Sequence, residues 1–383
     1  MNLQSLRCVF MRGGTSRALV FRRDDLPARR EDWDAIFLAA MGSPDDNSRQ
    51  LDGMGGGISS LSKVCVVGAP TRPDADVDYT FAQVGVDRAT VDYGGNCGNM
   101  SSAMGPFAAD ERLVDVPHDG EATVRIHITN TGKIIVAGFR MQGGRAAVEG
   151  DLAIDGVAGT GSPIRLEFRD VAGSRTGQLL PSGRAQDMLT RRDGAAVRAS
   201  LVDAANPCVF VAAEDLGLTG SELPEVLEAT DGLLDEFEHL RRQAAVLMGL
   251  APDAESAGAS RAVPFIGIVA APRDWRDRSG RELKASAADI SVRMLSSGQP
   301  HKAVPVTSAL CVAAAVRTPG TVPSNCASAD SCPIRIGHSS GTILVDATLD
   351  PATGRVLHAS VYRTARRLFQ GEVLFPVSRG SRS

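Results

Sequence analysis

The stretch that most constrains the fold is DYGGNCGNMSSAMGPFA, residues 92–108. An apolar, β-leaning run that ends at Val91 stops at two glycines, and small residues compatible with a helix follow Cys97. This order predicts a strand, a tight turn and a helix whose start carries the Cys97 thiol. A helix N-terminus has unpaired N–H groups and the positive end of a dipole, which favour a thiolate and attract a carboxylate. A buried structural cysteine is the plain alternative.

The second half of the chain repeats this plan. Residues 289–294 predict a strand, and the following segment has Gly298, then Pro300, then a run of small residues. Proline is favoured at the first position of a helix, so a buried helix is expected from Pro300 onward. His301 would then lie near the helix start, in a position analogous to Cys97. Two halves of similar plan predict two pseudo-symmetric domains with a ligand-binding cleft between them.

Composition limits the class of protein. A chain of 383 residues is long enough for two domains. Its 40 glycines and 20 prolines, with few long helical patterns, favour a β-rich α+β protein. The charge of −4 and the 4% aromatic content argue against nucleic acid as a partner. Without a membrane-length apolar run or a signal peptide, and with seven scattered cysteines, we expect a cytoplasmic protein with reduced thiols and no membrane partner.

Two more glycine-rich stretches adjoin predicted strands. MRGGTS, residues 11–16, separates strands expected at 6–10 and 18–21. The bare backbone of its two glycines could approach a ligand, with donors beside it, or the stretch could be an ordinary hairpin turn. The second stretch, DGMGGGISSLSK, leads through Ser59, Ser60 and Ser62 to Lys63 and a strand at 64–67.

The Lys63 stretch is not a phosphate-binding P-loop. That motif needs glycine directly before the lysine and serine or threonine after it, whereas Ser62 and Val64 flank Lys63 here. Glycines and hydroxyls can instead desolvate and orient the amine, although a solvated surface charge remains the plain alternative. We therefore treat Lys63 as a candidate catalytic residue.

In the second half, Pro207 interrupts a strand expected at 199–211, which suggests an edge or a bulge with Asn206 able to contact a ligand. Residues 222–250 form the longest helical pattern, and 181–199 is the best candidate for an interdomain linker. Residues 334–345 predict a strand, a loop and a strand, with His338, Ser339, Ser340 and Gly341 on the loop.

Taken together in this order, MRGGTS, DGMGG with SKV, GNCGN and GHSSG resemble the PrpF family over residues 7–375. Members of that family include 2-methylaconitate cis–trans isomerase, methylitaconate Δ-isomerase and 4-oxalomesaconate tautomerase. The resemblance implies a diaminopimelate-epimerase-like α+β fold, in which each of two domains curls a mixed sheet around a central helix. We expect an N-terminal domain of residues 1–185, completed by a strand near 368–383, and a C-terminal domain of residues 186–367.

The resemblance also implies a cofactor-free isomerase in which Lys63 and Cys97 handle protons. The groups expected to contact substrate carboxylates are Arg12, Gly13, Gly14, Thr15, Ser16, Ser59, Ser60, Ser62, Asn96, Gly98, Asn99, Asn206, His301, His338, Ser339, Ser340 and Gly341. Two positions depart from the common family pattern: Arg17 replaces a lysine, and Ser339 replaces a proline.

The chemistry needs one base, one acid and donors for enolate oxygens. Removing the acidic C–H beside the double bond of an unsaturated tricarboxylate gives a dienolate. Reprotonation at the same carbon after rotation gives cis–trans isomerisation, and reprotonation at the far carbon moves the double bond. A lysine in water is almost wholly protonated at neutral pH, so a lysine base would need desolvation or a neighbouring cation. The sequence leaves open which of Lys63 and Cys97 is the base.

Four other readings stay open. Cys97 with His301 or His338 could form a hydrolase, a second thiol could make an amino-acid epimerase, and a non-enzymatic acid-binding protein would tolerate loss of Lys63. A lysine Schiff base to pyridoxal phosphate is conceivable, but we expect no cofactor. Zinc is disfavoured because Cys326, Cys332 and His338 lack ligand spacing. The expected partner is a small unsaturated polycarboxylate, best a 2-methylaconitate or methylitaconate type, or else oxalomesaconate or aconitate, and the chain could form a homodimer.

Overall fold

The computed structural model describes residues 3–259, 263–328 and 332–376. The chain divides into two compact units, residues 1–167 with 363–383 and residues 168–362. The sequence-based boundaries were 185/186 and 367/368, and residues 377–383 of the expected last strand lie outside the described residues. The expected linker lies within the second unit, where two strands from this stretch pair as a hairpin.

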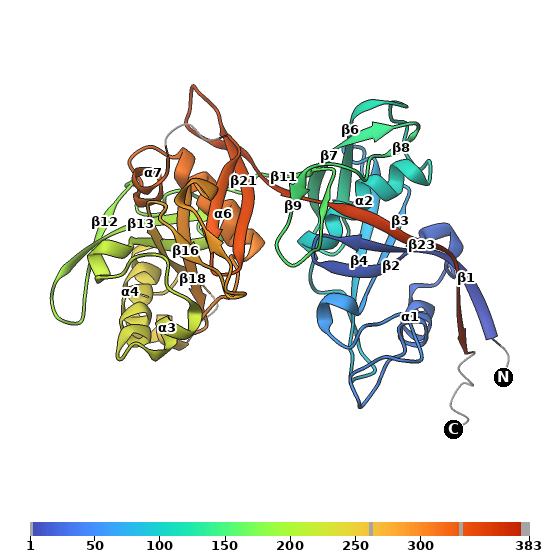
Figure 1. Ribbon diagram of the computed structural model, residues 1–383, viewed down its shortest axis with the longest axis horizontal. Helices are drawn as coiled ribbons and strands as arrows, with labels where there is room; N and C mark the ends of the chain where they lie inside the picture. Colours follow the sequence, from blue (N-terminus) through green and yellow to red (C-terminus); the bar gives the residue numbers. More distant parts are fainter. Residues whose placement is uncertain (1–2, 260–262, 329–331, 377–383) are drawn as a thin grey trace. The chain divides into compact units, whose positions relative to one another are not determined.

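The first unit is a mixed sheet with helices on both faces (Figure 1). Its elements are β1 (Leu3–Gly13), β2 (Ser16–Arg22), α1 (Trp33–Met41), β3 (Lys63–Gly68), β4 (Val77–Val84), β5 (Val91–Asp92), α2 (Gly98–Asp110), β6 (Gly120–Ile128), β7 (Lys133–Gln142), β8 (Arg145–Ala146), β9 (Leu152–Ala153), β10 (Thr160–Gly161) and β23 (Ala365–Pro376). β11 (Ile164–Arg169) carries the chain into the second unit.

The second unit has the same kind of layers. Its elements are β12 (Asp187–Thr190), β13 (Ala196–Ala204), β14 (Asn206–Ala212), α3 (Pro224–Ala229), α4 (Leu233–Leu247), α5 (Ala254–Ala259), β15 (Phe265–Ala270), β16 (Trp275–Arg276), β17 (Glu282–Leu283), β18 (Ile290–Ser296), β19 (Gln299–Pro300), α6 (Val306–Arg317), α7 (Val322–Cys326), β20 (Ile334–His338), β21 (Gly341–Leu349) and β22 (Val356–Arg363).

The two units repeat one order of strand pairings. In the first, β1–β2 is antiparallel, β2–β3 parallel, β3–β4 antiparallel, β4–β6 parallel and β6–β7 antiparallel. In the second, β13–β14, β14–β15, β15–β18, β18–β20 and β20–β21 follow the same alternation. Each parallel connection contains a helix, as a parallel crossover commonly does. The α+β architecture with a central helix in each repeat is confirmed.

In each unit, a matching ion pair lies where the second pair of parallel strands begins. Arg125 donates to the Asp76 carboxylate from its backbone N–H (2.7 Å) and its guanidinium (2.6 Å) just before β4 and β6 come into register. Arg335 does the same to Asp289, with both contacts at 2.7 Å, just before β18 and β20 do. We call these two pairs the strand clamps. Their equivalence supports the pseudo-symmetry at the level of single residues.

The central helices are buried because the strands curl around them. Every residue of α2 from Met100 to Ala109 is buried, and so is every residue of α6 from Ser308 to Ala315. A Cβ added to Gly105 would lie 2.9 Å from the Ala137 Cβ, so a small residue is needed where α2 meets β7. The small-residue composition of both segments thus reflects tight packing on all sides.

Longer apolar side chains pack against the face of each sheet that points away from its central helix. Trp33, Phe37 and Met41 of α1 form one core with Leu19 of β2 and Val64 of β3. In the second unit, α4 covers the equivalent face of β13, β14 and β15. The helical pattern at 222–250 is divided there into α3 and α4, because Gly232 takes a left-handed conformation (φ 69°) at the start of α4.

The prediction that a helix begins at Pro300 is wrong. Gln299 and Pro300 form β19, which pairs with the end of β18, and α6 begins at Val306 after Pro305. Pro305 disfavours a helical conformation at the residue before it, which delays the helix. His301 therefore lies outside the helix start, and Pro305 holds the position equivalent to Cys97.

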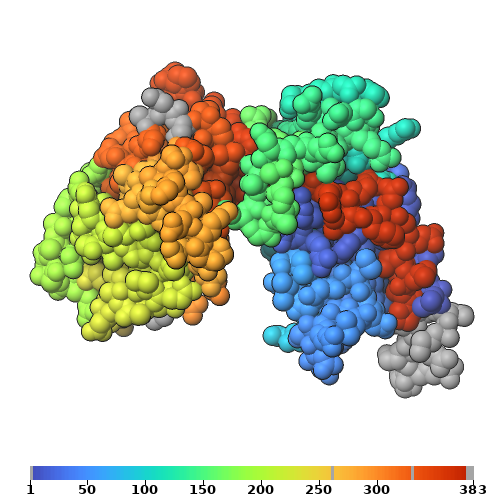
Figure 2. All heavy atoms as spheres, in the orientation of Figure 1, coloured from blue at the N-terminus to red at the C-terminus, as the bar shows by residue number. Residues whose placement is uncertain are grey.

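The first and last strands of the chain lie side by side. β23 pairs with β1 along its whole length, from Leu3↔Pro376 to Gly13↔Ala365. The space-filling view shows these blue and red segments adjacent on the surface of the first unit (Figure 2). The first unit is therefore completed by the C-terminal segment. None of the helices in the described ranges has the length and apolar character needed to cross a bilayer.

Candidate active site

Lys63 is the first residue of β3, and its side chain is buried although it carries an amine (7% exposed). The Nζ atom donates a hydrogen bond of 2.5 Å to Oε1 of Gln83, its register partner on β4. It also lies 5.1 Å from the ring centroid of Phe81. An amide oxygen and the face of an aromatic ring are both partners for a cationic amine. Strand alternation places Lys63, Phe81 and Gln83 on one face of the sheet.

Gln83 is a residue that sequence reasoning missed. Its Nε2 atom donates to the backbone oxygens of Ser59 (3.0 Å) and Ser62 (2.8 Å), which fixes the carboxamide with its oxygen toward Lys63. The available signal was a glutamine in a strand of otherwise mostly apolar residues, VDYTFAQV. Its partner depends on the β3–β4 register, which the sequence did not predict.

The three serines before Lys63 differ in their surroundings. Ser59 is exposed and Ser60 half-buried. The Ser62 side chain is fully buried, and its Oγ accepts a hydrogen bond of 2.8 Å from Nε2 of Gln50. The Ser62 hydroxyl is thus already used in holding the glycine-rich loop. Gln50 also accepts the backbone N–H of Gly57 (3.0 Å), so one buried amide ties the two ends of that loop together.

Cys97 caps the N-terminus of α2 in an extended conformation, as expected. Its carbonyl accepts the Ser101 N–H at 2.9 Å, and its Sγ lies 4.0 Å from Oγ of Ser16, the first residue of β2. The thiol is half-buried. Asn96 contacts the same turn, because its Oδ1 accepts a hydrogen bond of 3.4 Å from Ser101 Oγ. Sequence and structure therefore agree on a thiol beside free N–H groups at a helix start.

The Gly13–Gly14 turn packs against α2 at Asn99. A Cβ on Gly13 would lie 2.6 Å from the Asn99 carbonyl oxygen, and one on Gly14 (φ +51°) 2.3 Å from its Oδ1. Asn99 Nδ2 donates to Thr15 Oγ1 (3.1 Å), and Arg363 Nε donates to Asn99 Oδ1 (3.2 Å). The bare backbone at this turn is thus required by the helix itself. Gly98 is the first residue of α2.

Arg12 supports the same turn from inside. Its Nη1 donates to the carbonyl oxygens of Gly14 (3.0 Å) and Thr364 (2.9 Å). Burial, and then the charge of Arg366, lowers the pKa of Arg12. Arg12 therefore fixes the turn that carries Thr15 and Ser16 next to Cys97.

Lys63 and Cys97 lie within electrostatic range of one buried thiol, that of Cys65. Burial raises the pKa of Cys65, its hydrogen bond with Tyr79 lowers it, the Cys97 thiol raises it, and the Lys63 charge lowers it. Cys65 is two residues after Lys63 on β3 and shares its face of the sheet. The two candidate catalytic groups lie on β3 and at the start of α2, two elements of the first unit that pack against each other, and we call them one cluster.

A second cluster lies in the second unit. His301 Nε2 pairs with Ser296 Oγ at 2.7 Å, its ring stacks on Phe265 at 5.8 Å, and burial lowers its pKa. Ser340 Oγ donates to the Lys302 carbonyl (2.5 Å), which joins the segment after β19 to the β20–β21 turn.

That turn contains the other second-unit candidates. Ser340 N donates to His338 Nδ1 (3.1 Å), and the Trp275 indole donates to the His338 carbonyl (3.2 Å). Ser339 is buried, and Gly341 begins β21. Asn206 lies apart as the first residue of β14, where its Nδ2 donates to the Pro207 carbonyl (3.2 Å). Pro207 is near the strand start, where the parallel pairing with β15 has not begun.

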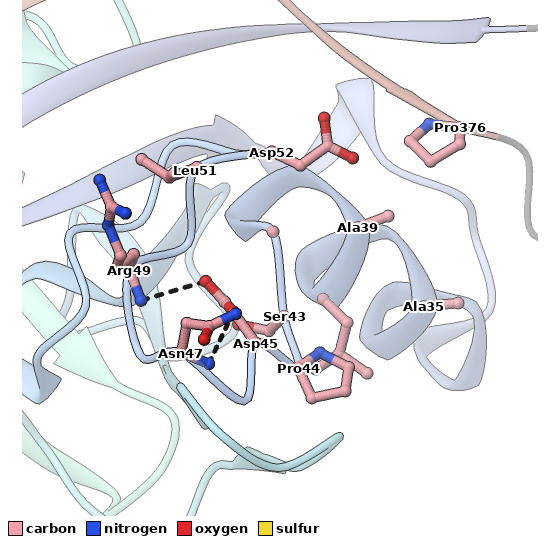
Figure 3. A pocket seen from close by; sticks show the side chains of 12 residues that line it. Ala35, Ala39, Ser43, Pro44, Asp45, Asn47, Arg49, Leu51, Asp52 and Pro376 are labelled. Carbon is pink, nitrogen blue, oxygen red and sulfur yellow. Dashed lines mark hydrogen bonds between the residues drawn. The ribbon is translucent and has the colours of Figure 1, made fainter.

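A pocket of about 850 Å³ beside α1 is a separate feature (Figure 3). Asp45, which lines this pocket, accepts hydrogen bonds from the backbone N–H groups of Asn47, Arg49 and Gln50, and these bonds lower its pKa. Asp45 thus holds the loop that carries Gln50, and Figure 3 shows its bonds to Asn47 and Arg49. Neither Lys63 nor Cys97 lines this pocket.

Over the described ranges, no group of three or more His, Cys, Asp and Glu side chains could hold a metal ion. The site chemistry that the chain itself offers is an amine, a thiol, amides, hydroxyls and helix N–H groups.

Comparison with known proteins identifies the family. The family model described as PrpF protein matches residues 3–376. The chain belongs to the PrpF family. It is 41% identical over 370 residues to "3-methylitaconate isomerase" of Eubacterium barkeri, with 96% of each chain covered. It is 36% identical to "2-methyl-aconitate isomerase" of Shewanella oneidensis, with 96% of each chain covered.

A solved PrpF-type structure agrees with the fold. The crystal structure of methylitaconate-delta-isomerase superposes with a TM-score of 0.89 at 40% identity, covering 98% of this chain and 96% of that one. The PrpF resemblance, the α+β architecture and the isomerase class expected from the sequence are confirmed. The roles of individual residues in this PrpF member stay predictions.

Proposed function

We propose that the chain isomerises a small unsaturated di- or tricarboxylate without a cofactor: one of Lys63 and Cys97 removes a proton from a substrate carbon, and the other returns a proton to the resulting dienolate. One observation carries this proposal: a buried amine, oriented by Gln83, and a thiol at the start of α2 belong to one cluster. Proton removal and return require a base and an acid positioned at the reacting carbon.

The other parts of the cluster suit the intermediate. The dienolate concentrates negative charge on carboxylate oxygens, which need fixed donors. The first-turn N–H groups of α2 and the Ser16 hydroxyl lie beside Cys97, and the Thr15 hydroxyl contacts Asn99 in the same helix turn. Donors of this kind stabilise the charge that develops after the C–H bond breaks.

The best candidate substrate is of the 2-methylaconitate or methylitaconate type. Relatives along the whole chain carry these names, and the protein named "4-oxalomesaconate tautomerase" of Pseudomonas putida is 38% identical with 97% of each chain covered. Oxalomesaconate and aconitate are therefore the alternatives. Geometric isomerisation and movement of the double bond share the first proton removal, so both products are compatible with the cluster.

An amino-acid epimerase with two equivalent thiols is disfavoured. The residues that begin the equivalent strand and cap the equivalent helix in the second unit are Phe265 and Pro305. Neither can exchange a proton, so the repeat supplies no second copy of the Lys63 and Cys97 pair.

The test combines substrate choice with two variants. The four candidate acids are incubated with the enzyme in deuterated water and followed by NMR for isomer formation and deuterium uptake. We expect Lys63→Ala and Cys97→Ser each to lower kcat by at least about 100-fold. Lys133→Ala and Cys332→Ser, at exposed positions, serve as matched controls. Exchange and isomerisation at wild-type rates in both site variants would remove the proposed roles.

A further inference from the structure

We infer that Gln83 is a positioning residue for the Lys63 amine, holding it toward the substrate through an anchored amide oxygen. This inference rests on the proposed function, because Gln83 acts only through Lys63.

The geometry of the amide is fixed by two acceptors. Gln83 Nε2 donates to the carbonyl oxygens of Ser59 and Ser62, at 3.0 and 2.8 Å. A carboxamide rotated by half a turn would direct its oxygen at these carbonyl oxygens, which is repulsive. The anchored orientation therefore leaves only Oε1 available to the amine, and the 2.5 Å contact with Nζ uses it.

A lysine side chain needs such a partner because it is long and flexible. Conformational entropy opposes fixing its rotamers. Burial of the Lys63 methylene groups restricts part of the side chain, and the hydrogen bond that Nζ donates to Gln83 sets the direction of the nitrogen. An amine that makes one hydrogen bond to Gln83 keeps its remaining substituent positions for the substrate.

The anchor is itself built into the fold. Ser62, whose carbonyl receives Gln83, is buried and held through its hydroxyl by Gln50. A Cβ on Gly55 would lie 2.3 Å from the Gln50 carboxamide, so the loop is shaped around that side chain. A series of hydrogen bonds, from Gln50 to Ser62, from Ser62 to Gln83 and from Gln83 to Lys63, thus connects the glycine-rich loop to the amine.

Two substitutions separate positioning from structure. Gln83→Met keeps the length of the side chain but removes the acceptor, and Gln83→Glu keeps an acceptor and adds a negative charge. We expect Gln83→Met to lower kcat by about 10- to 100-fold with KM changed by less than about threefold. Gln142→Met, at an exposed strand position, is the matched control and should retain wild-type kcat.

The pH dependence of kcat is the decisive measurement. A carboxylate beside the amine stabilises its ammonium form, so Gln83→Glu should move the limb of the kcat profile that Lys63 produces to higher pH by about one to three units. Gln83→Met should move the same limb to lower pH. The acidic limb moves if Lys63 acts as the base and the basic limb moves if it acts as the acid, so the experiment also assigns the direction of transfer.

The outcomes distinguish this inference from the proposed function. If Lys63→Ala is inactive but both Gln83 variants keep the wild-type kcat and pH limbs, the positioning role is wrong and the proposed function stands. If Lys63→Ala is fully active, the proposed function itself fails. Should Gln83→Met not fold, as judged by its thermal melt, the Gln83→Glu profile alone decides, because an unmoved limb contradicts the inference.

Discussion

At the scale of single residues, the site depends on how closely backbone can approach backbone. The Gly13–Gly14 turn and Asn99 fit together with no space for a side chain, and Asn99 also holds Thr15. The result is that a turn between two strands and the first turn of α2 act as one body. This contact brings Cys97 and Ser16 together, and Cys97 Sγ donates a long hydrogen bond of 4.0 Å to Ser16 Oγ.

Gly14→Ala tests this contact. The left-handed conformation of Gly14 costs an alanine about 1–2 kcal/mol, and the overlap with Asn99 should add about 1–3 kcal/mol. Gly132→Ala is the matched control, since Gly132 has φ +68° and its added Cβ would meet nothing within 4 Å. Denaturant unfolding of both variants measures the difference. Equal losses of stability would show that the turn and α2 are not tightly fitted.

The residue scale also shows how far the sequence carries. Lys63, Cys97 and the glycine turn have local signals, because spacing and composition predict a strand start or a helix start without knowledge of partners. Gln83 has only its polar side chain in a mostly apolar strand, and Gln50 has no local signal, because their roles arise from a strand register and a loop closure between distant residues. His301 was misplaced because β19 is made by pairing with β18, which outweighs the helix preference of a proline followed by small residues.

At the scale of elements, the strand clamps join strands that are far apart in the sequence. Asp76 precedes β4, and Arg125 lies on β6, so their bonds bring the two parallel strands into register at one end. Burial alone would raise the pKa of Asp76, but the hydrogen bonds and charge of Arg125 outweigh it and the pKa is lowered. The clamp therefore contributes stability only while Asp76 is ionised.

Asp76→Asn should reveal this as a pH-dependent loss. Because the folded-state pKa of Asp76 is lowered, its contribution is fully present above the unfolded value of about 3.9 and is lost as pH falls through the folded value. We expect the variant to be about 1–3 kcal/mol less stable at pH 7. The gap to wild type should narrow below about pH 4, as followed by urea unfolding, with exposed Asp151→Asn as control. A gap that does not change with pH would contradict the role of the ionised clamp.

At the scale of the whole molecule, one plan is used twice and only one copy carries the candidate acid and base. The equivalent pairings and the two strand clamps show that the second unit has the same framework. Lys63 and Cys97 are replaced there by Phe265 and Pro305. The fold therefore does not by itself determine the chemistry, which depends on a few side chains at equivalent positions.

The first unit should depend on the last strand. Deleting residues 363–383 removes β23, so that residues 3–8 of β1 lose their partner strand and residues 9–13 keep only β2. Residues 168–362 keep their own core. We expect the shortened chain to lose isomerase activity and to expose residues 3–13 to limited proteolysis, with the second unit protected. Adding a peptide of residues 363–376 tests reversibility. Full activity without this segment would show that β1 and β2 suffice.

This pairing of first and last strands has a consequence for synthesis. A ribosome makes the second unit complete before it makes the strand that finishes the first. During co-translational folding, residues 168–362 can therefore fold while β1 still lacks its partner strand β23. Lys63 and Cys97 are translated before β23, the strand that completes the sheet of their unit.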